Sequence, residues 1–552
     1  MSVDAVAEET AEPASDPTDA PRRWRRIPAL AATAGACLLM LFALVAPNDF
    51  NRFSLWAFVR IPVEGLVAVT LVLIVPGRAK RWVSVSLGLV LGLLTLLKIA
   101  DLGSFAVLYR PFDPVLDWAF VDAGVNYLSV TLGRFGAIAM VVGAVALTIA
   151  VPVLMVLSAL RLTRIVNAHR TAASRTVKVL AVVWLVFAVL RVPVASTNAA
   201  EYAYLHARQV PDGIRDQREF AKEVDADAFR DTPGAQLLTS LRGKDVMLVF
   251  VESYGRSAIE HPELAPEVGA VLDTGTQRLR AAGYDSRSGF LTSSTVGGGS
   301  WLAHATLVSG LRIDNQQRYR NLVTTDRVTL NRAFQRAGWR TVDVEPALIQ
   351  AWPEGNFFGY NEIYEASELG YRGPRFSYAT MPDQFILSAF HRAERVTPGH
   401  APLMAQITLL SSHAPWSPIP EIIDWARVGD GSIYHSMAAE GAPPEAIFQR
   451  ASDRVRADYG NSIVYSLNNV ISYVEKFGDD DLVLVFLGDH QPSPVVTGPD
   501  AGRDVPITIV TRDRAVLDRI SAWGWQEGLK PGPQAPVWRM DEFRDQFLTA
   551  FG

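Results

Sequence analysis

Five apolar stretches in the first two hundred residues constrain the fold of this 552-residue chain more than any other feature. They are residues 27–48, 55–75, 82–104, 135–160 and 177–198. The first and fourth contain no charged residue, and the others carry charges only toward their ends. At about 1.5 Å per residue, each is long enough to cross a hydrocarbon core of roughly 30 Å. We therefore predict an N-terminal domain of five transmembrane helices.

Arginine and lysine residues are concentrated in alternate loops around these stretches. Twelve lie before the first stretch, after the second or after the fourth: Arg22, Arg23, Arg25, Arg26, Arg78, Lys80, Arg81, Arg161, Arg164, Arg170, Arg175 and Lys178. The loops between them, 49–54 and 102–131, contain only Arg52 and Arg110. Because cytoplasmic loops carry the excess of positive charge, an odd number of spans places everything after residue 198 outside. We expect a multi-pass protein of the cell membrane with an extracellular domain.

The net charge argues against one class of protein, and the cysteine content excludes two kinds of structural site. A net charge of -5 is modest and does not suggest a nucleic-acid-binding protein. The only cysteine, Cys37, lies in the first apolar stretch, so neither an internal disulfide nor a zinc–thiolate site can form. The external part must therefore be stabilised by its hydrophobic core, and about 350 residues are enough for that.

The chain divides into four parts. Residues 1–21 are acidic and rich in Ala and Pro, which is typical of a disordered cytoplasmic tail; residues 22–198 form the membrane domain, and the polar stretch 199–243 predicts a helical connector. In 244–552, short apolar runs alternate with helical patterns such as "VTLNRAFQRAG" and "NSIVYSLNNVISYVEKFG". The runs are "KDVMLVFVES", "GWRTVDV", "PLMAQITLLSS", "DDLVLVFLGDH" and "VPITIVTRD". This alternation predicts an α/β domain with a mostly parallel sheet flanked by helices.

Potential ligands stand where three of these predicted strands end. Glu252 follows the first strand, His413 follows the third, and Asp489 and His490 follow the fourth. Ligands of such sheets bind beyond the carboxyl ends of the strands. An acid or a histidine after a strand is also common as a loop or cap residue. A site is therefore indicated only because all four residues stand at the ends of predicted strands.

Ser300 has two interpretations. It stands behind three glycines in "LTSSTVGGGSWLAHATLVSG", in front of an apolar run. It is either a nucleophile in an anion site at a helix N-terminus or merely the cap of that helix. With Glu252, Asp489 and His490 it completes a donor set suited to a divalent cation such as Zn²⁺ or Mn²⁺.

The motifs "VFVESYG", "GGGSWLAHATLVSG", "LLSSHAPW" and "FLGDHQP" resemble the sulfatase-like branch of the alkaline phosphatase superfamily. Five spans followed by an external domain resemble the lipoteichoic acid synthases and the phosphoethanolamine transferases. The resemblance implies one divalent metal ion, Mn²⁺ or Zn²⁺ with Mg²⁺ as a third candidate, held by Glu252, Asp489, His490 and the Ser300 oxygen. It also implies that Ser300 replaces a threonine nucleophile and that His413 binds the transferred phosphate.

The chain departs from these families at several places. The lipoteichoic acid synthases have a tryptophan and a nearby arginine in the glycerophosphate pocket. Trp352 in "QAWPEGNFFGY" stands in a similar place, but it is followed by Pro353 and Glu354 and not by an arginine. No histidine follows His490, and the disulfides of the phosphoethanolamine transferases cannot form. A single-metal site of the lipoteichoic kind therefore fits better.

The resemblance implies a membrane-anchored, metal-dependent phosphotransferase. It would move a phospholipid headgroup, phosphoglycerol or similar, onto an envelope glycan or glycolipid acceptor through a phosphoserine intermediate. Three alternatives remain: an extracellular phosphodiesterase or sulfatase-like hydrolase, a serine hydrolase that pairs Ser300 with His304, and an inactive envelope-binding module. Sulfate-ester hydrolysis is disfavoured because "SWLAH" lacks the proline and arginine of a sulfatase recognition motif. A serine hydrolase is disfavoured because "GGGSW" is not the Gly-x-Ser-x-Gly nucleophile elbow.

Overall fold

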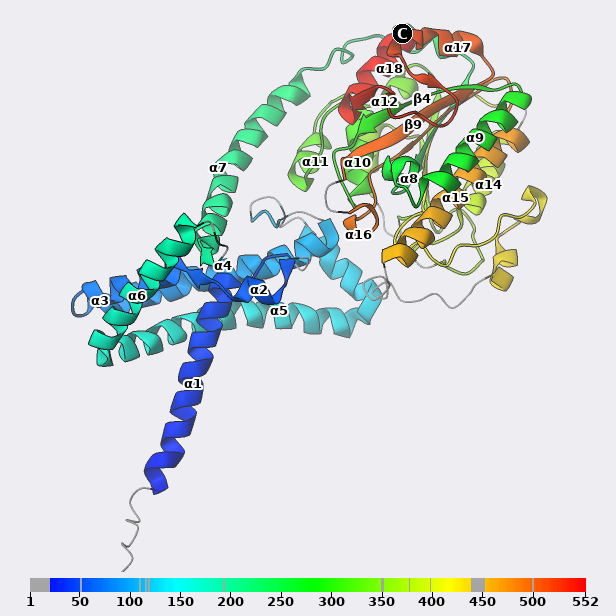
Figure 1. The fold of residues 1–552 in the computed structure, drawn as a ribbon. Helices are drawn as coiled ribbons and strands as arrows, with labels where there is room; N and C mark the ends of the chain where they lie inside the picture. Colours follow the sequence, from blue (N-terminus) through cyan, green and yellow to red (C-terminus); the bar gives the residue numbers. More distant parts are fainter. Residues whose placement is uncertain are drawn as a thin grey trace, which may run out of the picture. The chain divides into compact units, whose positions relative to one another are not determined.

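The computed structural model describes residues 20–49, 52–108, 111–114, 117, 120–190, 192, 194–348, 352–376, 378–397, 399–437, 452–498 and 501–552. Residues 1–19 of the predicted tail lie outside this part of the chain. The chain divides near residue 210 into two compact units. The first contains the N-terminal apolar helices, drawn from blue to cyan in Figure 1, and the second contains Pro211–Gly552.

Five apolar helices make up most of the first unit. They are α1 (Ala20–Val45), α3 (Val63–Ile74), α4 (Ala79–Leu108), α5 (Phe120–Ala168) and α6 (Arg170–Val189). All except α3 contain a segment long and apolar enough to cross a membrane. The predicted five-helix membrane domain is therefore confirmed as an arrangement of apolar helices, and the unit is that of a multi-pass membrane protein.

The second predicted span is shorter than the sequence suggests. Stretch 55–75 is divided into α2 (Leu55–Phe58), the two-residue strand β1 (Ile61–Pro62) and α3, which has 12 residues. Pro62 has no amide hydrogen and lies immediately before α3, where a missing donor costs nothing. β1 pairs in parallel with β2 (Ala195–Ser196), which follows α6. At about 1.5 Å per residue, α3 reaches about 18 Å.

The other spans differ from their predicted bounds in smaller ways. The fifth stretch, 177–198, is helical only to Val189 but begins earlier, at Arg170. α5 is longer than stretch 135–160 and is interrupted at Gly133, whose φ is 72°. Apolarity locates these helices well, but their ends depend on local backbone geometry.

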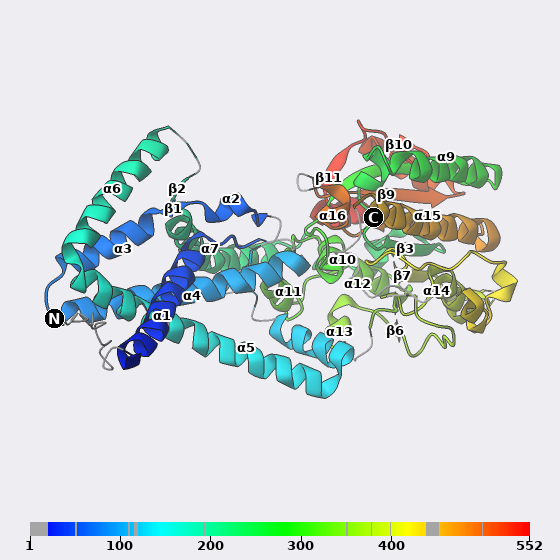
Figure 2. The same ribbon diagram turned by 60° about the horizontal axis from the view of Figure 1, so that its bottom comes forward.

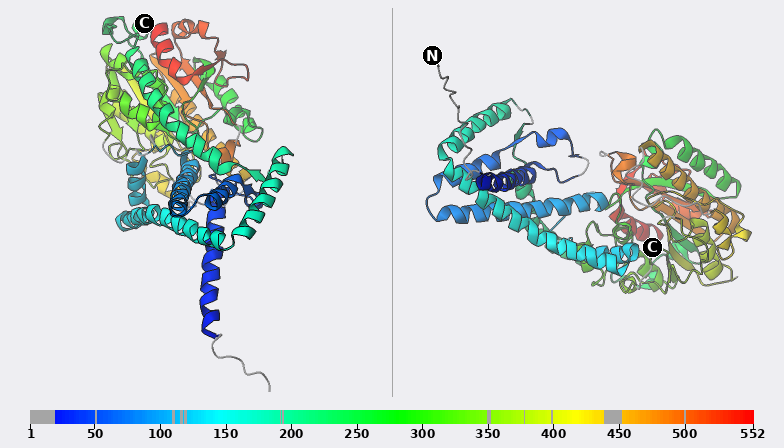
Figure 3. Two further views of the ribbon diagram at one scale, coloured as in Figure 1. Left: turned by 90° about the vertical axis from the view of Figure 1, so that its left-hand side faces the viewer. Right: turned by 90° about the horizontal axis from the view of Figure 1, so that it is seen from below.

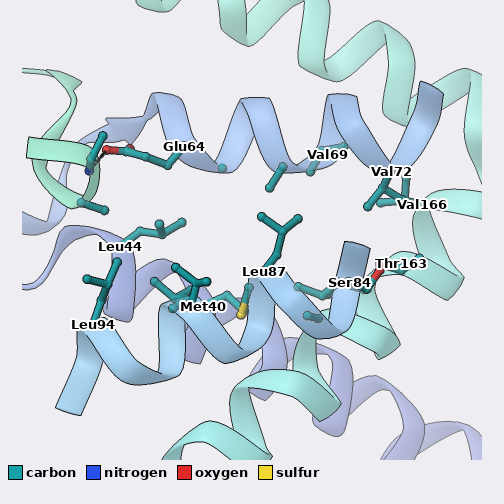
Figure 4. Close-up of a pocket in the computed structure, with 18 of the residues that line it drawn as sticks. Met40, Leu44, Glu64, Val69, Val72, Ser84, Leu87, Leu94, Thr163 and Val166 are labelled. Atoms are coloured by element: carbon teal, nitrogen blue, oxygen red, sulfur yellow. Dashed lines mark hydrogen bonds between the residues drawn. The ribbon is translucent and has the colours of Figure 1, made fainter. Parts of the chain in front are cut away.

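An apolar cavity of about 350 Å³ lies inside the first unit. Figure 4 shows Val69 and Val72 of α3 on one side of it and Leu87 of α4 on the other. Polar groups lie at its edges. Glu64 accepts a hydrogen bond from the Ala200 amide (2.8 Å).

A buried carboxylate joins the base of the connector helix α7 (Asn198–Asp225) to the membrane helices. Asp101 of α4 is completely buried, and its Oδ2 accepts hydrogen bonds from Asn48 Nδ2 (2.6 Å) and the Tyr202 hydroxyl (2.8 Å). His206 Nε2 lies 3.7 Å from Asp101 Oδ1. The start of α7 is thus attached to α4 by several contacts to one side chain.

The second unit is built on a nine-stranded sheet. Its strands are β3 (Asp245–Val251), β4 (Asp285–Thr292), β5 (Arg340–Glu345), β6 (Glu362–Glu365), β7 (Leu403–Leu409), β8 (Leu482–Gly488), β9 (Asp504–Thr511), β10 (Gln526–Glu527) and β11 (Val537–Arg539). The order is β10-β4-β9-β8-β3-β7-β5-β6, with β11 paired to β4. Strands β8, β3, β7, β5 and β6 are parallel, and β9 is antiparallel to β8 and β4. The predicted mostly parallel sheet is confirmed.

Both faces of the sheet are covered by helices. In Figure 1, α9 (Ala265–Ala281), α14 (Asp383–Phe390) and α15 (Ser452–Phe477) lie on one side of β4 and β9, and α10 (Ser300–Ser309), α12 (Leu330–Arg336) and α18 (Phe543–Phe551) lie on the other. Figures 2 and 3 show the same layers from other directions. The remaining helices are α8 (Ser257–Glu260), α11 (Gln316–Leu322), α13 (Gly355–Phe358), α16 (Pro494–Thr497) and α17 (Arg514–Arg519).

Strand β3 shows why both faces must be covered. Met247, Val249 and Val251 pack in the core with α9, α14 and α15, and the alternate residues Leu248 and Phe250 pack in the core with α10, α12 and α18. All of β3 is buried. A strand without an exposed face reads as a continuous apolar run, which is the pattern the sequence shows.

The second half of α7 packs on this domain. Arg318 of α11 pairs with Glu223 (3.1 Å) and donates to Asp216 Oδ2 (3.0 Å), and its guanidinium lies 4.9 Å from the Phe220 ring centroid. The division of the chain near residue 210 therefore falls inside the predicted connector 199–243.

Candidate active site and metal centre

The candidate site lies at the carboxyl ends of three adjacent parallel strands. β3 is hydrogen-bonded to β8 on one side and to β7 on the other. Glu252 follows β3, Asp489 and His490 follow β8, and His413 lies four residues beyond β7. Because parallel strands end at the same edge of a sheet, these positions come together although they are up to 238 residues apart in the sequence.

Glu252, Asp489 and His490 form a compact cluster. One potential ligand atom from each lies within 4.8 Å of the others. His490 Nε2 is 3.3 Å from Glu252 Oε1 and 3.6 Å from Asp489 Oδ2. All three side chains are buried.

Further hydrogen bonds orient the side chains of this cluster. Asp489 Oδ1 accepts hydrogen bonds from the Ser253 amide (2.8 Å) and from its neighbour His490 (2.7 Å). His490 donates from Nδ1 to the Gln491 carbonyl (2.8 Å), which leaves Nε2 facing the cluster. Ser253 has a φ of 56°, a left-handed conformation that a non-glycine residue adopts only where its surroundings hold it.

Ser300 faces the cluster and does not cap its helix. Gly299, with a φ of 81°, is the N-cap of α10, and Ser300 is the first helical residue. The left-handed Gly299 is accessible without strain only to a residue lacking Cβ. Ser300 Oγ donates to Glu252 Oε2 (2.9 Å) and lies 3.2 Å from His490 Nε2. The capping interpretation of this serine is therefore wrong.

The charges of the cluster are strongly coupled. Burial and the charge of Glu252 raise the pKa of Asp489 to about 7. Burial lowers the pKa of His490, but the two carboxylates outweigh burial and raise this pKa to about 9. Burial likewise raises the pKa of Glu252, and the charge and hydrogen bond of His490 reverse the effect and hold it well below its usual range. Without a cation, a proton on His490 balances part of the negative charge.

These residues fit a divalent metal ion. Asp489 Oδ2 is buried and has no hydrogen-bond partner in the described part of the chain, so one oxygen of the cluster is free to bind a cation. Two carboxylates, one imidazole and a hydroxyl are ligands that Zn²⁺ and Mn²⁺ accept. Glu252, Asp489, His490 and Ser300 Oγ would hold the ion. It would lower the pKa of the serine hydroxyl and stabilise negative charge on a phosphoryl group.

A cavity of about 430 Å³ opens beside Ser300. The two predicted substrate-binding residues, His413 and Trp352, both line it. His413 stacks on Tyr378, with ring centroids 3.7 Å apart, and its Nδ1 donates to the Ala414 carbonyl (2.6 Å). Its Nε2 is thereby left for a ligand. Trp352 donates from Nε1 to the Tyr319 hydroxyl (3.1 Å).

A polar patch that the sequence motifs did not lead us to expect lies on the sheet beneath this cavity. Asp343 and Glu345 of β5 and Gln406 and Thr408 of β7 all line it, and Asp343 is the register partner of Gln406. The signal was the period of two in "TVDVE" and "AQITLL". Polar residues on the same face of two buried strands indicate a ligand or a hydrogen-bond network.

The two carboxyl groups of this patch are strongly perturbed. Burial, followed by the charge of Glu345, raises the pKa of Asp343 well above its usual value. Burial also raises the pKa of Glu345 to about 7, although Thr408 donates a hydrogen bond to its Oε2 (2.7 Å).

His304 lines the same cavity as Ser300 but does not activate the hydroxyl of that serine. Its ring stacks on Phe250, with centroids 3.9 Å apart, and burial lowers its pKa to about 3. The Ser300 hydroxyl is hydrogen-bonded to Glu252 and lies beside His490. The geometry does not support a Ser300–His304 hydrolase.

Most of the second unit matches one protein-family model. Residues 244–505 match the family model described as Sulfatase. The second unit therefore contains a region that matches the sulfatase family model, in agreement with the resemblance of the motifs. No curated protein matches the chain in sequence.

Several solved structures resemble the chain at low sequence identity. The phosphoethanolamine transferase EptA from Neisseria meningitidis is 13% identical, with 94% of this chain and 95% of that chain covered and a TM-score of 0.42. The lipoteichoic acid synthase LtaP from Listeria monocytogenes is 15% identical (57% and 73% covered, TM-score 0.38). The phosphoglycerol transferase GacH from Streptococcus pyogenes is 13% identical (60% and 90% covered, TM-score 0.35).

Proposed function

We propose that this protein is a metal-dependent phosphotransferase of the cell membrane, with its sulfatase-family domain on the extracellular side. It moves a phospholipid headgroup, phosphoglycerol or a similar small phosphoester, onto an envelope glycan or glycolipid. The observation that carries the proposal is the Ser300 hydroxyl. It lies between Glu252 and His490 at the mouth of a cavity that can hold the headgroup.

The first half-reaction frees the lipid. Ser300 Oγ loses its proton to solvent and attacks the phosphorus, while the bond from phosphorus to the diacylglycerol oxygen breaks. Glu252, the hydrogen-bond acceptor of the serine hydroxyl, orients the attacking oxygen. The departing oxygen takes up a proton from water, which releases diacylglycerol and leaves a phosphoserine. His413 faces the same cavity and holds a phosphoryl oxygen through Nε2.

The second half-reaction reverses the first with another alcohol. An acceptor hydroxyl attacks the phosphorus, the bond from phosphorus to Ser300 Oγ breaks, and the serine recovers a proton. The membrane helices keep the site near its lipid donor and so raise the effective donor concentration. Water in place of the acceptor would make the same site a phosphodiesterase.

The test uses the full chain in liposomes of phosphatidylglycerol and phosphatidylethanolamine that carry fluorescent acyl chains. With Mn²⁺ or Zn²⁺ we expect fluorescent diacylglycerol, and without acceptor a headgroup phosphate adduct on the Ser300 peptide in mass spectrometry. EDTA should stop the reaction. If neither lipid releases diacylglycerol with any of Mn²⁺, Zn²⁺ and Mg²⁺, the proposed function is wrong.

A further inference from the structure

We propose that the buried end of the cavity selects a transferred headgroup that ends in a protonated primary amine, with Asp343 and Glu345 as the specificity-determining residues. The inference rests on the proposed function and narrows it to one substrate class. It follows from the hydrogen bonds and charges of the polar patch formed by Asp343, Glu345, Gln406 and Thr408.

The first observation is a buried carboxyl group without a partner. Asp343 is 1% exposed and lines the cavity, yet neither of its oxygens has a hydrogen-bond partner among the described residues. A buried polar group left unpaired is costly, so such groups are almost always paired in native proteins. A ligand in the cavity can supply the missing donors.

The surrounding polar groups also have spare acceptors. Asn331 donates from Nδ2 to the Tyr360 hydroxyl (2.9 Å) and to Gln406 Oε1 (3.4 Å), and its buried Oδ1 has no hydrogen-bond partner among the residues that the structure describes. Glu345 accepts hydrogen bonds from the Thr408 hydroxyl (2.7 Å) and from the Ala347 amide, so the spare acceptors are those of Asp343 and Asn331. Acceptors therefore outnumber donors, and an ammonium group, which has three donors and no acceptor, corrects this imbalance.

The charge of the cavity lining also favours a cationic group on the ligand. Its described lining residues include four carboxyl groups and no arginine or lysine; the acids are Glu252, Asp343, Glu345 and Glu354. A metal ion would balance the charge at Glu252, but nothing in that lining balances Asp343 and Glu345. A second anionic group on the ligand would be repelled, whereas a cation would form charge-assisted hydrogen bonds.

The depth of the patch indicates which part of the substrate it contacts. Asp343, Gln406 and Thr408 are at most 3% exposed, whereas Trp301 and Tyr378 on the same cavity are 40% and 45% exposed. In a two-step transfer, the departing lipid and the incoming acceptor must reach the phosphorus from the open side in turn. The transferred group stays on the protein throughout and therefore belongs at the closed end.

The main experiment compares two donor lipids with the full chain in liposomes, one preparation with phosphatidylethanolamine and one with phosphatidylglycerol. We expect kcat/KM for phosphatidylethanolamine to be at least about tenfold higher. Asp343→Asn keeps the shape and removes the charge, so it should abolish the preference for phosphatidylethanolamine. Glu345→Gln should act in the same direction. Glu362→Gln, an exposed change on the neighbouring strand β6, is the matched control and should leave the ratio unchanged.

A binding measurement separates failure of this inference from failure of the proposed function. The full-length Ser300→Ala variant is titrated with O-phosphoethanolamine and with glycerol 3-phosphate, each with Mn²⁺ present. We expect tighter binding of the amine and loss of that difference in the Ser300→Ala, Asp343→Asn double variant. Equal or tighter binding of glycerol 3-phosphate overturns the inference, whatever the chain transfers. Transfer from phosphatidylglycerol at the higher rate also overturns it and leaves the phosphotransferase function standing.

Discussion

Replacement of Ser300 by alanine is the most direct test of the site. The change removes one oxygen that donates to Glu252 Oε2 (2.9 Å) and lies 3.2 Å from His490 Nε2. Both partners are charged and buried, and a hydrogen bond to a charged group contributes about 1.5–3 kcal/mol. Because Ser300 is partly exposed, water can replace its hydroxyl. We therefore expect the metal-free variant to lose only about 1–3 kcal/mol of unfolding free energy, close to the range for one such bond.

The expected loss of activity is much larger than the loss of stability. Removing a nucleophile typically lowers kcat by about 10⁴- to 10⁶-fold. At about 1.36 kcal/mol for each factor of ten, this equals about 5.5–8 kcal/mol of transition-state stabilisation. Ser300→Thr supplies the same oxygen and should retain measurable activity.

The assay measures release of fluorescent diacylglycerol by the full chain in liposomes, with thermal unfolding recorded on the same samples. Ser462→Ala is a matched control because it removes a buried hydroxyl that donates to the Tyr459 carbonyl, away from the cavity. It should cost stability and leave activity unchanged. Transfer by Ser300→Ala above about one hundredth of the wild-type rate would falsify the nucleophile assignment, since the remaining groups cannot form a phosphoserine at that position.

Three further predictions concern the metal, the topology and the phosphate contact. The full chain should bind one divalent cation in elemental analysis, and full occupancy in the Asp489→Ala, His490→Ala double variant would exclude the proposed metal site. A reporter fused after residue 205 should be active outside the cell and one fused near residue 168 inside; the opposite result at either fusion would reject the five-span topology. His413→Ala should slow turnover by roughly a hundredfold without loss of the metal, and an unchanged rate would remove His413 from the site.

The two parts of the chain differ in how much their sequence revealed. Apolarity located all five N-terminal helices, because lipid allows few charged residues in a spanning helix. It did not reveal that the second span is interrupted before Pro62, where β1 pairs with β2 from residues 195–196. That pairing joins segments more than 130 residues apart, and a hydropathy pattern contains no information about it.

The more deeply a strand of the second unit is buried, the more clearly its sequence predicted it. β3, β7, β8 and β9 are buried and read as apolar runs, whereas β4 contains "DSRSG" and the short strands β6, β10 and β11 have no pattern of their own. β4 is nevertheless held along its whole length by β9. Its conformation comes from its neighbour, so local propensity could not reveal it.

The sequence by itself determined the class of the protein and the chemistry available to it. The apolar stretches required a membrane domain, and acids and histidines at strand ends together with a glycine-flanked serine specified the donors of a site. Only the tertiary structure decided what those donors face. The parallel register of β8, β3 and β7 brings Asp489, Glu252 and His413 to one edge, and a left-handed Gly299 turns Ser300 toward Glu252 and not toward its own helix. The pairing of Asp343 with Gln406 then adds an acidic floor to the cavity. Such contacts depend on strand order and register, which arise from packing of the whole domain and not from any local stretch of sequence.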